Sequence, residues 1–228
     1  MKNEMIAVIF DMDGVLVDVS MSYIAAIQKT AQYFLDETIT RSEIEEYRNR
    51  GGLNNDWDLT AHILNERGKP VDKKLLIDVF QSFYLGHEFN GLIQNEQWLL
   101  QKDIIDRLHA SYPMGIVTGR PKIEAHYVLK RFKVEECFSV LITMDDIPPD
   151  KKKPDPFGIE LALQRFPAES AIYIGDTVDD MVAAKRAGVI PIGVISPGND
   201  KDSQREALIQ NGACYILRDV SDILEVLA

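Results

Sequence analysis

The sequence is poor in cysteine: its 228 residues include only two, Cys137 and Cys214. They lie far apart and in no spacing typical of metal ligands, so the sequence indicates neither a disulfide framework nor a zinc site. We expect both to be buried thiols. With 46% hydrophobic and 27% charged residues, the composition is that of an ordinary globular protein rather than a disordered chain.

Long apolar runs and an excess of positive charge are also absent. No stretch approaches the roughly 18 apolar residues of a membrane span. The apolar segment near the N-terminus is too short for a signal peptide and ends at Asp11. We therefore expect a cytoplasmic protein that does not contact membranes. The formal net charge of −11 argues against nucleic-acid binding, which needs clustered lysines and arginines, but it allows a small anionic substrate.

Short apolar runs alternate with helical patterns over most of the chain. The runs cover Met5–Phe10, Met114–Thr118, Val140–Thr143, Ala171–Gly175 and Ile190–Ile195. Such alternation predicts an α/β fold with a parallel sheet, helices on both of its faces and right-handed crossovers.

One interval, from Asp18 to about Asn90, has no convincing strand pattern. Its residues show amphipathic helical periodicity, and Thr40-Arg-Ser-Glu43 has the pattern of a capping box. This predicts an inserted α-helical cap over residues 18–90, joined to a core of residues 1–17 and 91–228. The two linkers would let the cap close over a pocket at the sheet.

Carboxylates follow two of the predicted strands. Asp11 and Asp13 come directly after the first strand, and Asp176 and Asp180 follow the fourth. Ligands of open α/β sheets bind at the carboxyl ends of strands. Oxygen ligands without a nearby His or Cys favour Mg²⁺ over zinc or copper. One alternative for the second acidic group is that it only complements a helix N-terminus, which suits Asp179 and Asp180 but does not explain Asp176.

Two other segments offer contacts for an anion. Thr118-Gly119, at the end of the second strand, combines a hydroxyl with close backbone approach and can hold a phosphate oxygen. The alternative is that Thr118 caps the following helix. Pro154 fixes the backbone directly after Lys153, so Lys153 is expected to be the best held of three consecutive lysines. Its ammonium group could neutralise a carboxylate and a phosphoryl group. Most such runs are solvated loops, and that alternative stays open here.

In chain order, four segments resemble the motifs of the haloacid dehalogenase-like hydrolase superfamily. They are Asp11-x-Asp13-Gly-Val, Thr118-Gly, Lys153-Pro and Gly-Asp176-x-x-x-Asp180. The resemblance spans almost the whole chain. The helical insertion is similar to the cap of the branch that contains phosphoglycolate phosphatase and β-phosphoglucomutase. The resemblance implies a Rossmann-like core.

The resemblance also implies a role for each motif residue. Asp11 would be the nucleophile that forms an aspartyl-phosphate, and Asp13 would protonate the leaving oxygen and then activate water. Mg²⁺ would be held by Asp11, the backbone carbonyl of Asp13 and Asp176, with Asp180 holding a metal-bound water. The implied substrate contacts are Gly14, Thr118, Gly119 and Lys153.

Asp13 and Lys152 are two positions at which comparison with the superfamily pattern bears on the prediction. Dehalogenases of this superfamily lack an acid at the position of Asp13, whereas phosphatases and phosphomutases keep it, so the resemblance argues against dehalogenation. Lys152 stands where many relatives have glycine, which leaves open whether Lys152 or Lys153 enters the site.

Substrate choice is expected to lie in the cap. The segment from Arg48 to Trp57 gathers polar side chains around a Gly-Gly break, and we interpret it as a specificity loop in which Asn54 and Asn55 contact the substrate. The alternative is a connector in which Asp56 caps the next helix and Trp57 fills the bundle.

Together these features predict a Mg²⁺-dependent phosphatase that hydrolyses a small soluble phosphorylated metabolite through an aspartyl-phosphate. One alternative is a phosphomutase of the β-phosphoglucomutase type, which returns the phosphoryl group to a sugar. Another is a low-turnover sensor of phosphorylated ligands. The sequence leaves open the substrate, for which phosphoglycolate and histidinol phosphate are candidates by family analogy, and the oligomeric state, monomer or homodimer.

Overall fold

The computed structural model describes residues 5–50, 53, 55–168, 170–198 and 201–227. Contacts within the chain divide it into two compact units. The first unit consists of Met1–Val17 and Trp98–Ala228, and the second consists of Asp18–Gln97. The short strands β2 (Val17–Asp18) and β3 (Gln97–Trp98), at the two points where the chain passes between the units, form a two-stranded sheet.

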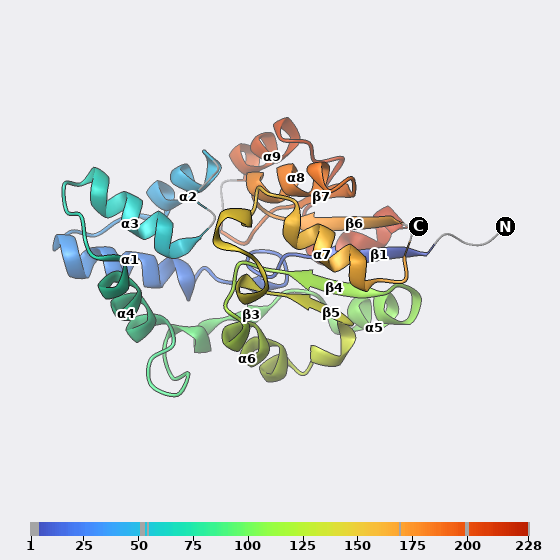
Figure 1. The fold of residues 1–228 in the computed structure, drawn as a ribbon, viewed down its shortest axis with the longest axis horizontal. Coiled ribbons are helices and arrows are strands. Elements are labelled where there is room, and N and C mark those ends of the chain that lie inside the picture. The colour runs from blue at the N-terminus through green and yellow to red at the C-terminus, as the bar shows by residue number, and fades with distance from the viewer. Residues whose placement is uncertain (1–4, 51–52, 54, 169, 199–200, 228) are drawn as a thin grey trace. The chain divides into compact units, whose positions relative to one another are not determined.

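The first unit is built on a six-stranded sheet whose paired strands are all parallel (Figure 1). In spatial order the strands are β5 (Val140–Ile142), β4 (Met114–Val117), β1 (Ile6–Phe10), β6 (Ser170–Gly175), β7 (Ile190–Val194) and β8 (Tyr215–Leu217). The predicted α/β fold is therefore confirmed. None of the predicted strands corresponds to β8, a three-residue edge strand with an exposed tyrosine.

Helices connect the strands of this sheet or follow the last of them. They are α5 (Lys102–Ser111), α6 (Lys122–Phe132), α7 (Phe157–Arg165), α8 (Val178–Arg186), α9 (Lys201–Gln210) and α10 (Ile223–Leu227). Short 3₁₀ turns cover Glu135–Cys137, Met144–Asp146, Pro149–Lys151 and Val220–Asp222.

The central strand β1 is buried on both faces, as its unbroken apolar sequence predicts. On one face Ile9 joins a cluster with Ile159 of α7 and Ala183 of α8. On the other face Phe10 meets the ring of Phe138 edge to face, with 6.2 Å between ring centroids. This double burial places the end of β1, and the acids that follow it, at the middle of the sheet.

The second unit is helical, as predicted for the insertion. It contains α1 (Tyr23–Leu35), α2 (Arg41–Asn49), α3 (Asp56–Glu66), α4 (Lys73–Tyr84) and the 3₁₀ turn η1 (Leu92–Asn95). The predicted capping box is present at the start of α2, where Thr40 and Glu43 bond each other's backbone N–H groups.

The interior of the helical unit is aromatic and ends in a buried acid. The rings of Tyr23 and Tyr84 stack with centroids 4.1 Å apart, and Phe80 lies 6.0 Å from Tyr23. Glu96 is buried and accepts hydrogen bonds from Ser22 Oγ at 2.9 Å and Tyr84 Oη at 3.0 Å. These bonds tie the segment after α4 to α1, so the unit extends to Gln97, beyond the predicted boundary at residue 90.

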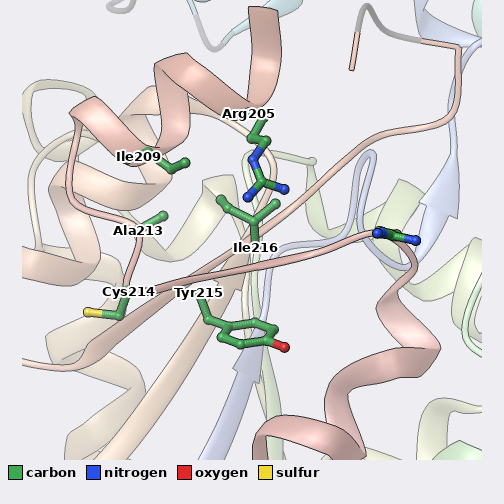
Figure 2. A pocket seen from close by; sticks show the side chains of 7 residues that line it. Arg205, Ile209, Ala213, Cys214, Tyr215 and Ile216 are labelled. Carbon is green, nitrogen blue, oxygen red and sulfur yellow. The ribbon is translucent and has the colours of Figure 1, made fainter. Parts of the chain in front are cut away.

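The expectation of two buried thiols is wrong. Both cysteines are free, but Cys137 is only partly buried and Cys214 is exposed, because it lies next to the edge strand β8. Cys214 belongs to the lining of an open cavity of about 490 Å³ beside α9 (Figure 2), whose other lining residues are Arg205, Ile209, Ala213, Tyr215, Ile216 and Arg218. None of the four sequence motifs contributes to this cavity. Among the described helices, none is both long and apolar enough to cross a membrane.

Replacing Phe80 with alanine should destabilise the helical unit. Because the ring is fully buried between aromatic neighbours, we expect F80A to lower the free energy of unfolding by about 3–5 kcal/mol, measured by urea denaturation followed by circular dichroism. The matched control is L75A on the same helix, where the side chain is 49% exposed and the expected change is within about 1 kcal/mol. Equal costs for the two variants would contradict this packing.

Candidate active site

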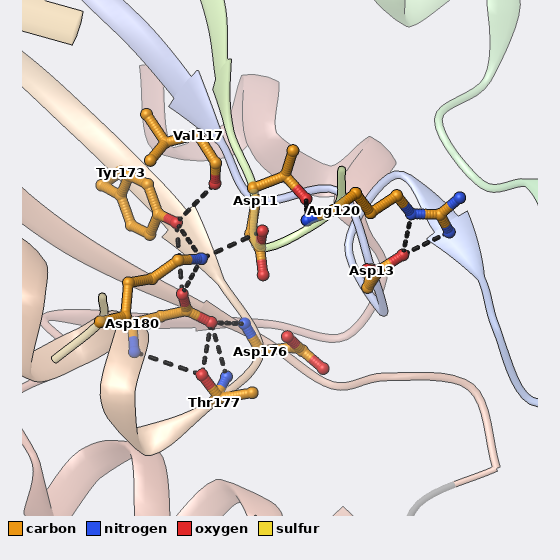
Figure 3. Close-up of polar contacts among 10 residues, drawn as sticks. Asp11, Asp13, Val117, Arg120, Tyr173, Asp176, Thr177 and Asp180 are labelled. Carbon is orange, nitrogen blue, oxygen red and sulfur yellow. Dashed lines mark hydrogen bonds and ion pairs between the residues drawn. The ribbon is translucent and has the colours of Figure 1, made fainter. Parts of the chain in front are cut away.

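Three buried aspartates meet at the carboxyl edge of the sheet (Figure 3). Asp11 follows β1 and Asp176 follows β6, and these strands are paired, so the two side chains leave the sheet next to each other. Asp180 reaches the same point from the first turn of α8. One carboxylate oxygen from each residue lies within 4.8 Å of the other two.

Lys153 supplies a positive charge to this cluster. Its side chain is only 6% exposed, and its Nζ lies 2.7 Å from Asp180 Oδ1 and 3.1 Å from Asp11 Oδ1, the latter an ion pair without hydrogen-bond geometry. By contrast, Lys151 is exposed and pairs with Asp155 at 3.3 Å. Of the consecutive lysines, the structure therefore brings Lys153 to the acids.

Burial and crowding set the protonation of the cluster. Burial raises the pKa of the Asp11 carboxyl well above its ordinary value; Lys153 opposes this, and the charges of Asp180 and Asp176 add to it. Burial alone would lower the pKa of Lys153, but attraction to Asp11 and Asp180 outweighs it and holds that pKa well above the usual range. The cluster thus combines three carboxylates with one ammonium, an excess of negative charge.

Asp180 is held by the N-terminus of α8 as well as by the lysine. Its Oδ2 accepts hydrogen bonds from the N–H groups of Asp176 and Thr177 and from Thr177 Oγ1, at 2.6–3.2 Å, and Thr177 Oγ1 accepts from Asp180 N–H to complete a capping box. Its Oδ1 accepts from Lys153. Asp180 therefore complements the end of α8 and also faces the cluster, and its role in holding a metal-bound water stays a prediction.

Tyr173 is a fully buried member of the cluster that the sequence analysis missed. Its hydroxyl accepts a hydrogen bond from Lys153 Nζ at 2.9 Å and lies 3.2 Å from Asp180 Oδ1 and 3.3 Å from the carbonyl of Val117. Burial, followed by the charge of Asp180, raises the pKa of Tyr173 well above its usual value, so the phenol stays neutral. Tyr173, a residue of β6, thus helps to hold the ammonium group of Lys153 in place.

A second set of missed residues orients Asp176. Ser196 Oγ donates a 2.5 Å hydrogen bond to Asp176 Oδ2, and Gln204 Nε2 donates to the Asp176 carbonyl at 2.8 Å and to Ser196 Oγ at 3.1 Å. Both partners are buried. They follow β7 in the sequence and reach the site only through the fold, so no local pattern could have found them.

Gly14 leaves room for the carboxylate of Asp176. Its φ is +75°, which favours glycine, and a Cβ at this position would lie 2.2 Å from Asp176 Oδ2. The turn after β1 can therefore pass directly against Asp176 only because residue 14 has no side chain.

Asp13 does not join the three clustered carboxylates. It pairs instead with Arg120, whose Nε donates to Asp13 Oδ1 at 2.6 Å and whose Nη2 also contacts that oxygen (Figure 3). Arg120 was not among the predicted site residues. Its position directly after Thr118-Gly119 is the sequence signal that could have identified it.

Thr118 and Gly119 lie at the end of β4, which is paired with β1 at the same edge. Thr118 is fully buried, and its Oγ1 accepts a hydrogen bond from Arg120 N–H at 3.1 Å. The alternative that Thr118 caps the next helix is wrong, because the N-cap of α6 is Pro121. Gly119 is exposed, with open space where a Cβ would stand.

The proposed specificity loop is only partly described. Asn54 lies outside the described residues. Asn55 is the N-cap of α3 and accepts a hydrogen bond from Asp58 N–H at 3.0 Å, whereas Asp56 pairs with Arg48. The alternative that Asp56 caps this helix is therefore off by one residue. Substrate contact by Asn54 and Asn55 stays a prediction.

The donor set of the aspartate cluster fits a hard divalent cation. All of its donors are carboxylate oxygens, which suit Mg²⁺ or Mn²⁺ better than zinc or copper. Burial is the main cause of the raised pKa of Asp11, the charges of the neighbouring acids add to it, and a bound cation would favour the ionised carboxylate. Chemically, the site can present a carboxylate nucleophile beside bound positive charge.

Comparisons with known proteins agree with this geometry. Residues 8–194 match the family model described as haloacid dehalogenase-like hydrolase. Over 226 residues the chain is 25% identical to the pyrophosphatase PpaX of Bacillus pumilus (strain SAFR-032), covering 96% of this chain and 94% of that protein. A haloacid dehalogenase-like family hydrolase from Streptococcus pneumoniae has the same fold, with a TM-score of 0.76, 22% identity, and coverage of 98% of this chain and 99% of that one.

Another relative is longer than this chain. Over 200 residues the chain is 36% identical to a protein of Phytophthora nicotianae named imidazoleglycerol-phosphate dehydratase, covering 84% of this chain but 43% of that protein. The chain thus spans less than half the length of this relative.

Alanine at position 14 should cost more than the backbone conformation alone explains. G188A is the matched control, since Gly188 has a φ of +74° with nothing near its Cβ, and we expect it to cost about 1–2 kcal/mol of unfolding free energy. G14A must also displace Asp176, which should add about 1–3 kcal/mol. Urea denaturation of both variants measures the difference, and equal costs would show that Asp176 does not press against this turn.

Proposed function

Since this chain belongs to the haloacid dehalogenase-like hydrolase family, we propose that its aspartate cluster is the active site of a Mg²⁺-dependent phosphatase acting on a small phosphomonoester. The observation that supports this most is the buried meeting of Asp11, Asp176 and Asp180 with Lys153 at the carboxyl edge of the sheet. A structural salt bridge would not require three buried acids around one lysine at the same edge of the sheet.

Asp11 is the nucleophile in this proposal. One of its carboxylate oxygens bonds to phosphorus while the bond from phosphorus to the leaving oxygen breaks, which forms an aspartyl-phosphate. Lys153, 3.1 Å from Asp11 Oδ1, stabilises the negative charge shared by the carboxylate and the phosphoryl oxygens. Thr118, at the end of the neighbouring strand, contacts a phosphoryl oxygen through its hydroxyl.

Asp13 moves the protons. It gives its proton to the leaving oxygen as the first bond breaks, and it then takes a proton from the water that attacks the aspartyl-phosphate. The second step releases phosphate and restores the Asp11 carboxylate. General acid–base help of this kind is typically worth about 10²–10⁴ in rate.

The residues that would hold Mg²⁺ are Asp11, the backbone carbonyl of Asp13 and Asp176, with Asp180 nearby. When bound, the cation supplies positive charge that offsets the repulsion between the phosphoryl group and the carboxylates. Ser196 and Gln204 keep Asp176 oriented for this purpose. The backbone at Gly14 and Gly119 is available for close approach to the substrate.

The helical unit, residues 18–97, is proposed to select the substrate. The names of two relatives suggest where to begin. The 36% identical relative is named for a dehydratase of imidazoleglycerol phosphate, so phosphate esters of imidazole-bearing alcohols come first. The relative PpaX is named a pyrophosphatase, so inorganic pyrophosphate comes next, before phosphoglycolate and sugar phosphates.

Substitution of the nucleophile tests the reaction. We expect wild-type protein to release phosphate from at least one of these compounds with Mg²⁺ and not with EDTA, and D11N to lose this activity by about 10⁴-fold or more, because an amide is not a nucleophile here. The control is D150N, which changes an exposed aspartate. Full metal-dependent activity in D11N would contradict the proposal, and a sugar phosphate isomerised faster than it is hydrolysed would indicate a phosphomutase.

Removal of one supporting hydrogen bond tests the metal site. Because Ser196 donates a 2.5 Å bond to Asp176 Oδ2, we expect S196A to weaken Mg²⁺ binding by about 10–100-fold in isothermal titration calorimetry. S139A is the matched control, since Ser139 Oγ donates a hydrogen bond to the carbonyl of Met114 and, among the described residues, to no group of the aspartate cluster. Equal Mg²⁺ affinity in wild type and S196A would argue against Asp176 as a ligand.

A further inference from the structure

Arg120 is an arginine whose side chain is 0% exposed. A guanidinium stays charged in proteins, so its burial requires a nearby anion. Asp13 provides one: its Oδ1 accepts from Arg120 Nε at 2.6 Å and also contacts Nη2 (Figure 3). Two nitrogens of the arginine thus contact the same oxygen of the carboxylate.

The backbone of Arg120 is held on both sides. Its N–H donates to Thr118 Oγ1 at 3.1 Å, and its carbonyl accepts from Met144 N–H at 2.9 Å. The turn that carries Asp13 is equally constrained, because Gly14 N–H donates to the Val17 carbonyl at 2.8 Å. The ion pair therefore joins two rigid segments, one after β4 and one after β1.

The two oxygens of Asp13 differ. Oδ1 is the oxygen that both arginine nitrogens contact, whereas the described residues make no hydrogen bond to Oδ2, and the side chain is 28% exposed. A carboxylate anchored through one oxygen cannot rotate freely, so its other oxygen keeps one direction. That oxygen is the one available to exchange a proton with a substrate.

We propose that Arg120 is a positioning residue that holds Asp13 so that Oδ2 performs the proton transfers. This inference rests on the proposed phosphatase reaction and adds a residue to it. Asp13 Oδ2–H gives its proton to the leaving oxygen as the P–O bond breaks, and the resulting carboxylate later takes a proton from water. Arg120 keeps all of its own protons throughout.

Esters with different leaving groups can distinguish positioning of Asp13 by Arg120 from a merely structural role of Arg120. An alkyl phosphate must be protonated as its alcohol leaves, whereas p-nitrophenolate leaves without a proton. The experiment compares kcat/KM for p-nitrophenyl phosphate with kcat/KM for the alkyl phosphate that wild type hydrolyses best, in wild type, R120A and R120K. Because kcat/KM reports the first irreversible step, the later attack of water does not obscure the comparison.

We expect R120A to lower kcat/KM for the alkyl phosphate by about 100-fold or more and for p-nitrophenyl phosphate by less than about 10-fold. R120K should fall between wild type and R120A, because an ammonium keeps the charge but cannot grip one oxygen with two nitrogens. Guanidinium chloride at low concentration should restore part of the alkyl phosphatase activity of R120A. Equal losses on the two esters, or no loss on either, would overturn the proposal.

Two controls keep the outcomes separate. R165K changes an arginine whose guanidinium faces Asp146 at 3.9 Å on the surface, and it should leave both rates unchanged. If R120A does not fold, as judged by its thermal melt, R120K retains the buried cation and decides the question by the same ratio. A wild type inactive on every ester, with or without Mg²⁺, would instead refute the proposed function and not the role of Arg120 alone.

Discussion

A buried ion pair makes the acidic site possible. Three carboxylates with oxygens within 4.8 Å of one another would repel strongly in the interior, and burial by itself already raises the pKa of Asp11. Lys153 offsets this by facing both Asp11 and Asp180 while Tyr173 fixes its ammonium. The parallel register of β1 and β6 brings Asp11 and Asp176 together, the capping box of α8 holds Asp180, and the missing side chain at Gly14 leaves room for Asp176.

The two aspartates after β1 are kept in different electrostatic surroundings. Asp11 is buried beside Lys153 and the other acids, whereas Asp13 is partly exposed and paired with Arg120. Enzymes that need one carboxylate as a nucleophile and another as an acid and base separate the two in this way. Here only one residue, the buried Met12, lies between Asp11 and Asp13 in the chain, and the two carboxylates still have different partners.

Much of the fold and of the acidic cluster could be predicted because each depends on local sequence. Buried strands are continuous apolar runs, and the acids stand directly at their ends. The missed features depend on contacts between distant segments: Ser196 and Gln204 reach Asp176 from beyond β7, and Arg120 reaches Asp13 from the segment after the neighbouring strand β4. The short edge strand β8 has too few residues for a pattern, and the helix cap at Asn55 differs from the expected position by one residue because Asp56 is engaged by Arg48.

The most direct test of the account is chemical trapping of the phosphorylated enzyme. Protein quenched in acid during turnover is treated with sodium borohydride, which reduces an aspartyl-phosphate to homoserine, and its peptides are examined by mass spectrometry. The account predicts homoserine at position 11 and only in samples that received substrate. Phosphate release without any modified residue, or homoserine at another aspartate, would contradict Asp11 as the nucleophile.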